Sequence, residues 1–180
     1  MIAQLDDGRL VASTPYAALP DRVPTLGEAL DACDGMWVNV EIKNDPDEPD
    51  FDSTDLIADE TMALLLARGT DHRWLISCFR VETVDRCHAI APHIPTAWLC
   101  VEAPSGTAAD LVRRGHGALH PWVGALTKAM VDECHAHGLR VNTWTYDDPD
   151  RMRELIGWGI DGICTNVPDV AIRVRAGEPA

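Results

Sequence analysis

Strand-like and helix-like segments alternate along almost the whole of this 180-residue chain. Six short apolar runs are each followed by a longer segment in which apolar residues recur at helical spacing. The expected strands are 36–42, 73–79, 96–101, 117–120, 139–146 and 161–165. Repeated βα units place the strands parallel to one another, with right-handed crossovers through the helices. The alternation therefore restricts the chain to the α/β class, as a doubly wound open sheet or as a (β/α)8 barrel.

The helix-like segments carry signals that mark where helices begin. Thr25 followed by Glu28 fits a capping box, and Asp148 followed by Pro149 fits an N-cap with proline at the first helical position. The expected helices are 25–33, 56–69, 80–90, 106–115, 126–138 and 148–159, with a weaker one at 168–175. Each expected strand is thus followed by a helix.

The number of units favours an incomplete barrel over an open sheet. No G-x-G-x-x-G turn follows the first expected strand, which weakens a dinucleotide-binding sheet. A barrel has eight units in typically ~250 residues, about two units more than this chain holds. We expect residues 1–180 to form a single domain of about six βα units, with an irregular lead-in at 1–24. The acidic segment 44–55 lacks the glycine and the closing glutamate of an EF-hand, so we expect a solvated loop there.

Composition narrows the class of function. The formal net charge is −14, which repels polyphosphate backbones and argues against nucleic-acid binding, whereas it is compatible with divalent cations. No apolar run approaches 18 residues and no signal peptide is visible, so no membrane span is expected. The six cysteines show no C-x-x-C spacing, which favours reduced thiols. We therefore expect a cytoplasmic location, with a signal peptide upstream of the present Met1 left open.

Two charged residues interrupt the apolar strand "WVNVEIKN". Because side chains alternate along a strand, Val40 and Ile42 share one face, and Glu41 and Lys43 share the other. In a barrel the second face points inward at the carboxyl end of the strand, where the active sites of barrels lie. A carboxylate there can bind a hard cation, and an ammonium can bind phosphate. The alternative is a structural ion pair at the strand end, since pairing is the usual remedy for buried charge.

Two further strands place polar or aromatic side chains on the inward face. Ser77 and Phe79 face inward in "LISCF", and Asn142, Trp144 and Tyr146 share one face in "VNTWTY". The alternatives are a satisfied strand hydroxyl for Ser77 and plain core packing for Trp144. Several strands thus offer polar or aromatic groups to one mouth.

These segments together resemble the bacterial glycerophosphodiester phosphodiesterases, a family of metal-dependent (β/α)8 barrels. The motifs that carry the resemblance are "VPTLGEALDAC", "VNVEIKN", "LISCFR", "VNTWTYDDPD" and "DGICTNVPD", in this order between Val23 and Val170. The resemblance implies that Glu41 binds the metal, Mg²⁺ or Ca²⁺, and that Lys43 holds the phosphate.

The resemblance implies roles for four more residues. Phe79 and Trp144 match aromatic residues that line the glycerol side of the pocket, and Ser77 matches the first serine of an S-S-F motif. His120, in "ALHPW", aligns with a polar position on the sixth barrel strand. One departure from the pattern is Cys78, which stands where the family has its second serine.

The family's opening motifs are not found in this sequence. They are an H-R-G strand, an E-x-D strand and an H-D turn, which supply both catalytic histidines and two metal carboxylates. No catalytic residue is therefore retained, and we expect a chain that is truncated at its N-terminus and inactive as it stands.

The function implied by the resemblance is metal-dependent hydrolysis of glycerophosphodiesters to glycerol 3-phosphate and an alcohol, in lipid and glycerol metabolism. Two alternatives remain: a non-catalytic barrel remnant or binding module, and a different barrel enzyme that uses Lys43 as a base or Schiff-base amine. We expect a small-molecule substrate as the binding partner, and self-association through open barrel edges.

Overall fold

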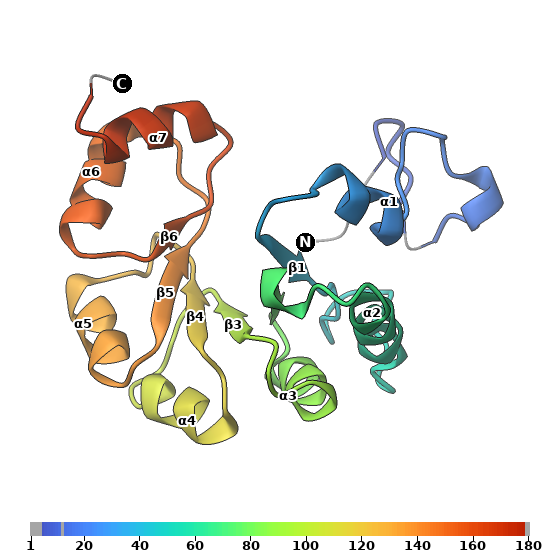
Figure 1. Cartoon of the computed structure of the whole chain (residues 1–180), viewed down its shortest axis with the longest axis horizontal. Coiled ribbons are helices and arrows are strands. Elements are labelled where there is room, and N and C mark those ends of the chain that lie inside the picture. Colours follow the sequence, from blue (N-terminus) through green and yellow to red (C-terminus); the bar gives the residue numbers. More distant parts are fainter. Residues whose placement is uncertain (1–4, 12, 179–180) are drawn as a thin grey trace. The chain divides into compact units, whose positions relative to one another are not determined.

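The computed structural model describes residues 5–11 and 13–178. The chain divides into two compact units, the first ending at Thr96 and the second beginning at Ala97 (Figure 1). The expectation of a single domain over 1–180 stays a prediction.

The described residues form six strands, and each is followed by a helix (Figure 1). The strands are β1 (Val38–Glu41), β2 (Trp74–Cys78), β3 (Thr96–Cys100), β4 (Ala118–Pro121), β5 (Arg140–Thr143) and β6 (Gly162–Ile163). The helices are α1 (Leu26–Ala32), α2 (Leu56–Ala67), α3 (Val81–Ile90), α4 (Thr107–Arg114), α5 (Lys128–Ala136), α6 (Pro149–Gly157) and α7 (Pro168–Arg175), with 3-10 turns η1 (Tyr16–Ala18) and η2 (Asp71–Arg73). These elements confirm the predicted α/β class.

Strand pairing follows the order of the chain within each unit. In the first unit β1 pairs in parallel with β2, with Val38 opposite Trp74 and Glu41 opposite Ser77. In the second unit β3, β4, β5 and β6 pair in parallel in that order. A doubly wound sheet reverses its strand order at a switch point, whereas a barrel keeps consecutive strands adjacent. The observed order is the one that a barrel requires.

The core of the first unit lies between its two strands and the helices α2 and α3. Val40 and Ile42 of β1 and Ile76 of β2 are buried in one apolar cluster, as the two-residue period predicts. The other members of this cluster are Leu30, Ala58, Met62, Leu65, Trp74, Cys78, Val84, Cys87, Ala91 and Ile94. Asn39 and Lys43, one residue out of phase, are exposed. One face of β1 thus packs on the helices, while the opposite face carries the exposed polar side chains.

The second unit buries a corresponding set of side chains. Leu119 of β4 and Val141 of β5 lie opposite each other and are almost fully buried. Leu111, Val131, Met152 and Leu155 of the surrounding helices are buried with them. The helices α6 and α7 lie side by side at the C-terminal end of the chain (Figure 1).

Local signals explain where several helices begin. Thr25 Oγ1 accepts a hydrogen bond from the Glu28 amide, and Glu28 Oε2 accepts one from the Thr25 amide at 2.8 Å. The predicted capping box of α1 is therefore confirmed. Asp148 caps α6 through the amides of Asp150 and Arg151.

Several expected elements differ in extent from the structure. The strand expected over 139–146 is formed by Arg140–Thr143, and the one expected over 36–42 by Val38–Glu41. The last strand, expected over 161–165, is formed by two residues, Gly162 and Ile163. The lead-in 1–24 contains the short turn η1, and residues 1–4 and 12 of it lie outside the described part of the chain. Across the described residues, none of the helices combines the length and the apolar character needed to cross a bilayer.

The capping box gives a direct stability test. Replacing Thr25 with alanine removes the acceptor for the Glu28 amide, so we expect the free energy of unfolding to fall by about 1 kcal/mol in urea titrations. Thr25→Ser keeps the acceptor and should stay close to the unchanged chain. Equal stabilities for the alanine and serine variants would show that this box contributes nothing.

Candidate functional site

Glu41 and Lys43 stand at the carboxyl end of β1, on the face that does not enter the apolar cluster. Lys43 Nζ lies 2.5 Å from Glu41 Oε1 and donates a hydrogen bond to it. The Lys43 side chain is 44% exposed and the Glu41 side chain is 31% exposed, so solvent still reaches the pair. The ion pair considered as the alternative is therefore present. It leaves two of the three N–H donors of the ammonium for other acceptors.

Ser77 lies next to this pair on the neighbouring strand. It is the register partner of Glu41, so both side chains project to the same side of the two-stranded sheet. The Ser77 side chain is fully buried, and its Oγ has no hydrogen-bond partner among the described residues. A buried hydroxyl without a partner costs roughly 1–3 kcal/mol. Ser77 is thus not the satisfied strand hydroxyl that was the alternative.

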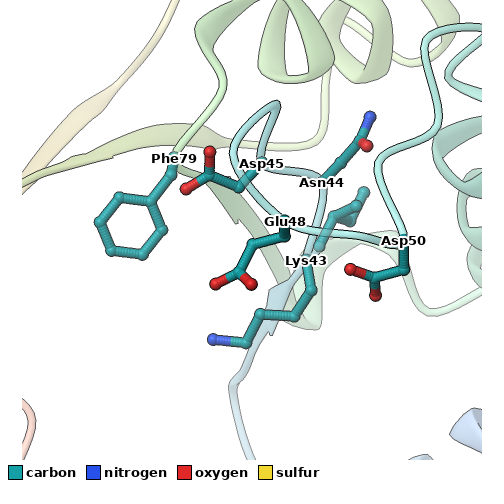
Figure 2. A pocket seen from close by; sticks show the side chains of 7 residues that line it. Lys43, Asn44, Asp45, Glu48, Asp50 and Phe79 are labelled. Atoms are coloured by element: carbon teal, nitrogen blue, oxygen red, sulfur yellow. The ribbon is translucent and has the colours of Figure 1, made fainter. Parts of the chain in front are cut away.

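A small pocket opens beside Lys43 at the ends of β1 and β2. Its lining consists of Ile42, Lys43, Asn44, Asp45, Glu48, Asp50 and Phe79. Figure 2 shows the Lys43 amine and the Glu48 carboxylate on the same side as the Phe79 ring, and the Asn44 amide directed away from them. The cavity volume is about 20 Å³, which is room for one water molecule.

The loop that follows β1 is pinned at its base. Asn44, which is 2% exposed, accepts a hydrogen bond from the Asp52 amide at 2.9 Å and donates one to the Asp52 carbonyl at 3.0 Å. Residues 45–51 form the loop between these two points. The solvated loop expected over 44–55 is therefore solvated in its middle and hydrogen-bonded at both ends.

Sequence reasoning missed a polar cluster at the end of this loop. Asp55 accepts hydrogen bonds from Asn44 Nδ2, Thr83 Oγ1 and Arg80 Nη1. One signal was available in the sequence. Asn44 shares the phase of Val40 and Ile42, so the strand period places a polar side chain on the helix-facing side.

His120 belongs to the second unit, on β4. Its side chain is 5% exposed, and Asn142 Nδ2 lies 2.8 Å from His120 Nε2. Burial lowers the pKa of His120 from 6.5 to about 4. The ring is therefore neutral at pH 7 and accepts a hydrogen bond from the Asn142 amide.

Trp144, which follows β5, is held against His120 through the backbone. Its indole Nε1 donates a hydrogen bond to the His120 carbonyl at 2.9 Å, and the ring is half-buried. Gly162 supports the neighbouring contact, because a Cβ at this position would lie 2.5 Å from Asn142 Oδ1. The structure thus brings His120 and Trp144 together in one unit, and Glu41, Lys43, Ser77 and Phe79 in the other.

The metal ligand set is incomplete in the part of the chain that the structure describes. Over residues 5–11 and 13–178, no group of three or more His, Cys, Asp or Glu side chains is placed to hold a cation. Ca²⁺ takes six to eight oxygens, and Mg²⁺ demands near-ideal octahedral geometry. Glu41 supplies one carboxylate, and its Oε1 already contacts Lys43. The described residues alone do not fit a divalent cation, and the assignment of Glu41 as a ligand stays a prediction.

The family model and the related sequences that match this chain all belong to one family. A sequence model of the glycerophosphoryl diester phosphodiesterase family matches residues 2–170. A glycerophosphodiester phosphodiesterase of Bacillus subtilis (strain 168) is 26% identical over 172 residues, which cover 92% of this chain and 58% of the relative. Another from Caldanaerobacter subterraneus subsp. tengcongensis is 26% identical over 160 residues, 87% of this chain and 64% of the relative. The chain thus spans about three fifths of the length of these two relatives.

Solved structures of two phosphodiesterases share the fold. A glycerophosphodiester phosphodiesterase from Parabacteroides distasonis matches with a TM-score of 0.75 at 20% identity, over 97% of this chain and 68% of the other. A phosphodiesterase from Oleispira antarctica, solved with its product sn-glycerol-3-phosphate, matches with a TM-score of 0.69 at 21% identity, over 85% and 61%. These similarities confirm the predicted partial barrel of six βα units.

The buried imidazole predicts a pH dependence of stability. His120 is neutral in the folded chain down to pH about 4, whereas in the unfolded chain it takes up a proton below pH about 6.5. The unfolded state then binds more protons in this window. We expect the free energy of unfolding to fall by roughly 3 kcal/mol as the pH is lowered from 6.5 to 4, with no contribution from this group above the window.

Urea titrations at a series of pH values measure this dependence, with His120→Gln as the comparison. Glutamine keeps a polar side chain beside Asn142 but does not titrate, so its curve should be flatter over this range. The other histidines and the carboxylates contribute to both curves alike. Parallel curves would contradict a depressed pKa at His120.

Proposed function

Because the chain belongs to the glycerophosphoryl diester phosphodiesterase family, we propose that the protein takes part in hydrolysing glycerophosphodiesters to glycerol 3-phosphate and an alcohol. The observation that carries the proposal is the Glu41–Lys43 pair at the carboxyl end of β1, inside the matched region. The relative from Oleispira antarctica holds sn-glycerol-3-phosphate, which is the product this reaction releases. That product supports the choice of substrate class for this chain.

The proposed role of Lys43 is to hold the phosphate. Hydrolysis adds water across one P–O bond, so that oxygen from water joins phosphorus and the departing alcohol gains a proton. Negative charge on the non-bridging oxygens grows in the transition state, and a fixed ammonium stabilises it. The ion pair with Glu41 uses one N–H donor and keeps the amine at the strand end.

The other residues have supporting roles in this proposal. Phe79 and Trp144 offer apolar faces to the glycerol or head-group carbons, and Ser77 offers a hydroxyl in need of a partner. His120 is neutral at pH 7 and holds Trp144 through its carbonyl, so we assign it a positioning role rather than proton transfer. The cation proposed for the reaction, Mg²⁺ or Ca²⁺, would supply charge neutralisation, with Glu41 as one ligand.

The proposal also covers self-association through a strand edge. Among the described strands β1 pairs with β2 alone, which leaves its other edge without a partner strand. Met36 and Trp37, just before β1, are 57% and 72% exposed. An edge strand beside exposed apolar side chains is a site where a second copy can pair.

The phosphate role is tested by Lys43→Gln, with Lys128→Gln as the matched control. Lys128 is the other lysine of the chain, lies on α5 and pairs with Asp132 at 2.7 Å. A hydrogen bond from a charged donor contributes about 1.5–3 kcal/mol, so glycerol 3-phosphate affinity should fall about 10- to 100-fold for the first variant. The control should bind as the unchanged chain does.

Binding is measured by NMR titration, and hydrolysis of glycerophosphocholine with Mg²⁺ or Ca²⁺ is assayed on this chain and on an N-terminally extended version. Binding without turnover by both would favour the binding-module alternative. No glycerol 3-phosphate binding, or equal binding by the two glutamine variants, would refute the phosphate role of Lys43.

Self-association is tested by Trp37→Lys, with Tyr16→Lys as the control. Tyr16 is 74% exposed but lies in η1 and away from the strand edge in sequence. We expect sedimentation velocity to show concentration-dependent oligomers for the unchanged chain and the control, and fewer for Trp37→Lys. A monomer at all concentrations would contradict an open-edge contact.

A further inference from the structure

The first βα loops of the chain are joined by a buried polar cluster, which we call the Asp55 cluster: Asn44, Asp55, Arg80 and Thr83. Asp55 Oδ1 accepts from Asn44 Nδ2 at 2.8 Å and from Thr83 Oγ1 at 2.6 Å. Arg80 Nη1 donates to both Asp55 oxygens, at 2.8 and 2.7 Å. Asn44 and Thr83 also contact each other at 3.2 Å. Asn44, Arg80 and Thr83 therefore each donate a hydrogen bond to the Asp55 carboxylate.

The surroundings make this cluster more than a surface ion pair. The side chains of Asp55 and Arg80 are 14% and 18% exposed, and Asn44 and Thr83 are 2% and 0% exposed. Charges removed from water in this way need full pairing, and losing one partner leaves the other uncompensated. The cluster is therefore held together as a unit.

The local structure at Asp55 does not follow the usual pattern. Asp55 is the residue before α2, where an aspartate normally caps the helix amides, but its side chain makes no cap hydrogen bond. Its φ is +56°, in the left-handed region that few residues other than glycine and asparagine adopt readily. The carboxylate turns instead toward Arg80, Thr83 and Asn44. Departures from local preference, such as this missing cap and this positive φ, are expected where a side chain serves a functional site.

The cluster lies directly behind two of the proposed substrate-binding residues. Asn44 is the neighbour of Lys43 in the chain, and Arg80 is the neighbour of Phe79. Figure 2 shows Asn44 directed away from the Lys43 amine, as alternation requires. Asp55 thus links the backbone behind the phosphate-binding amine to the backbone behind the aromatic ring.

We infer that Asp55 is a positioning residue for the substrate site, holding Lys43 and Phe79 at a fixed separation around the phosphate ester. The inference rests on the proposed function, because it assigns Lys43 to phosphate. A binding group displaced by about 1 Å can lose about 10²-fold in effectiveness, which is why a rigid support behind it matters. Asp55 itself touches no substrate in this account.

The chain contains a matched control for the Asp55–Arg80 pair. Asp55 and Arg80 stand just before α2 and α3, and within these two helices Asp59 and Arg86 form a second aspartate–arginine pair, at 2.7 and 2.9 Å. Among the described residues, that pair makes no hydrogen bond to Asn44 or Thr83, and its side chains are 37% and 51% exposed for Asp59 and Arg86. Asp59→Asn therefore changes the charge between α2 and α3 without touching the cluster.

The test uses Asp55→Asn, Asp55→Gly and Thr83→Val. Asparagine and glycine both tolerate the left-handed backbone, so they change the side chain and spare the turn. Valine keeps the shape of Thr83 without its hydroxyl and leaves the Asp55–Arg80 pair in place. Thr83→Val therefore tests the cluster even if Asp55→Gly does not fold. NMR titration with glycerol 3-phosphate gives affinity, and the Asn44 side-chain amide signals report the cluster without ligand.

We expect Asp55→Gly to weaken glycerol 3-phosphate binding about 10-fold, with smaller losses for Asp55→Asn and Thr83→Val. The Asn44 amide signals should move in all three. Asp59→Asn should keep both the affinity and these signals, even where its melting temperature falls. A merely stabilising Asp55 would lower the melting temperature and leave the affinity of the folded variants unchanged.

Two failures are distinguishable. If the unchanged chain binds glycerol 3-phosphate and Lys43→Gln does not, but the folded cluster variants bind like Asp59→Asn, the positioning role is refuted and the proposed function stands. If the unchanged chain does not bind, or if Lys43→Gln binds equally well, the proposed function is refuted and the positioning role with it.

Discussion

A β-strand sends neighbouring side chains to opposite faces, and the end of β1 depends on that alternation. Ile42 and Asn44 enter the interior, while Glu41 and Lys43 remain on the other side. One strand therefore carries both an apolar anchor and a charged pair without burying the charges. A shift of register by one residue would exchange the two sets. Such a shift would place an ammonium in the apolar cluster with Ile76, which the packing there excludes.

Charge at this site is balanced locally, in spite of the acidic character of the whole chain. Lys43 is paired with Glu41, and Arg80 with Asp55, so each basic group at the ends of β1 and β2 has a carboxylate partner. The two pairs differ in burial. Lys43 remains open to solvent and therefore to an anionic ligand, whereas Arg80 is enclosed. The exposed cation is thus the group suited to binding and the enclosed one to support.

The sequence was sufficient for features that depend on near neighbours. The capping box of Thr25 and Glu28 spans three positions, and the faces of β1 follow from a period of two, so both were predicted and confirmed. The six βα units follow in the same way from short apolar runs that alternate with segments of helical spacing. The barrel type needed the resemblance as well, because alternation alone also fits an open sheet.

Features that depend on distant partners could not be predicted. The contacts of Asp55 join residues 11, 25 and 28 positions apart, and Asn142 meets His120 across 22 positions. No local pattern specifies which of 29 acidic residues turns inward. The exposure of Lys43 and the burial of Ser77 likewise depend on what lies above that face of the sheet, which strand alternation does not specify.

The pinned base of the loop after β1 has a consequence for how such a site can change. Two hydrogen bonds between Asn44 and Asp52 close the base of the loop. Residues 45–51, between these two points, form turns through hydrogen bonds among themselves. The length and side chains of residues 45–51 can change during evolution, or be exchanged by design, while the end of β1 keeps its conformation. Changes within residues 45–51 are therefore expected to leave the backbone that carries Lys43 where it is.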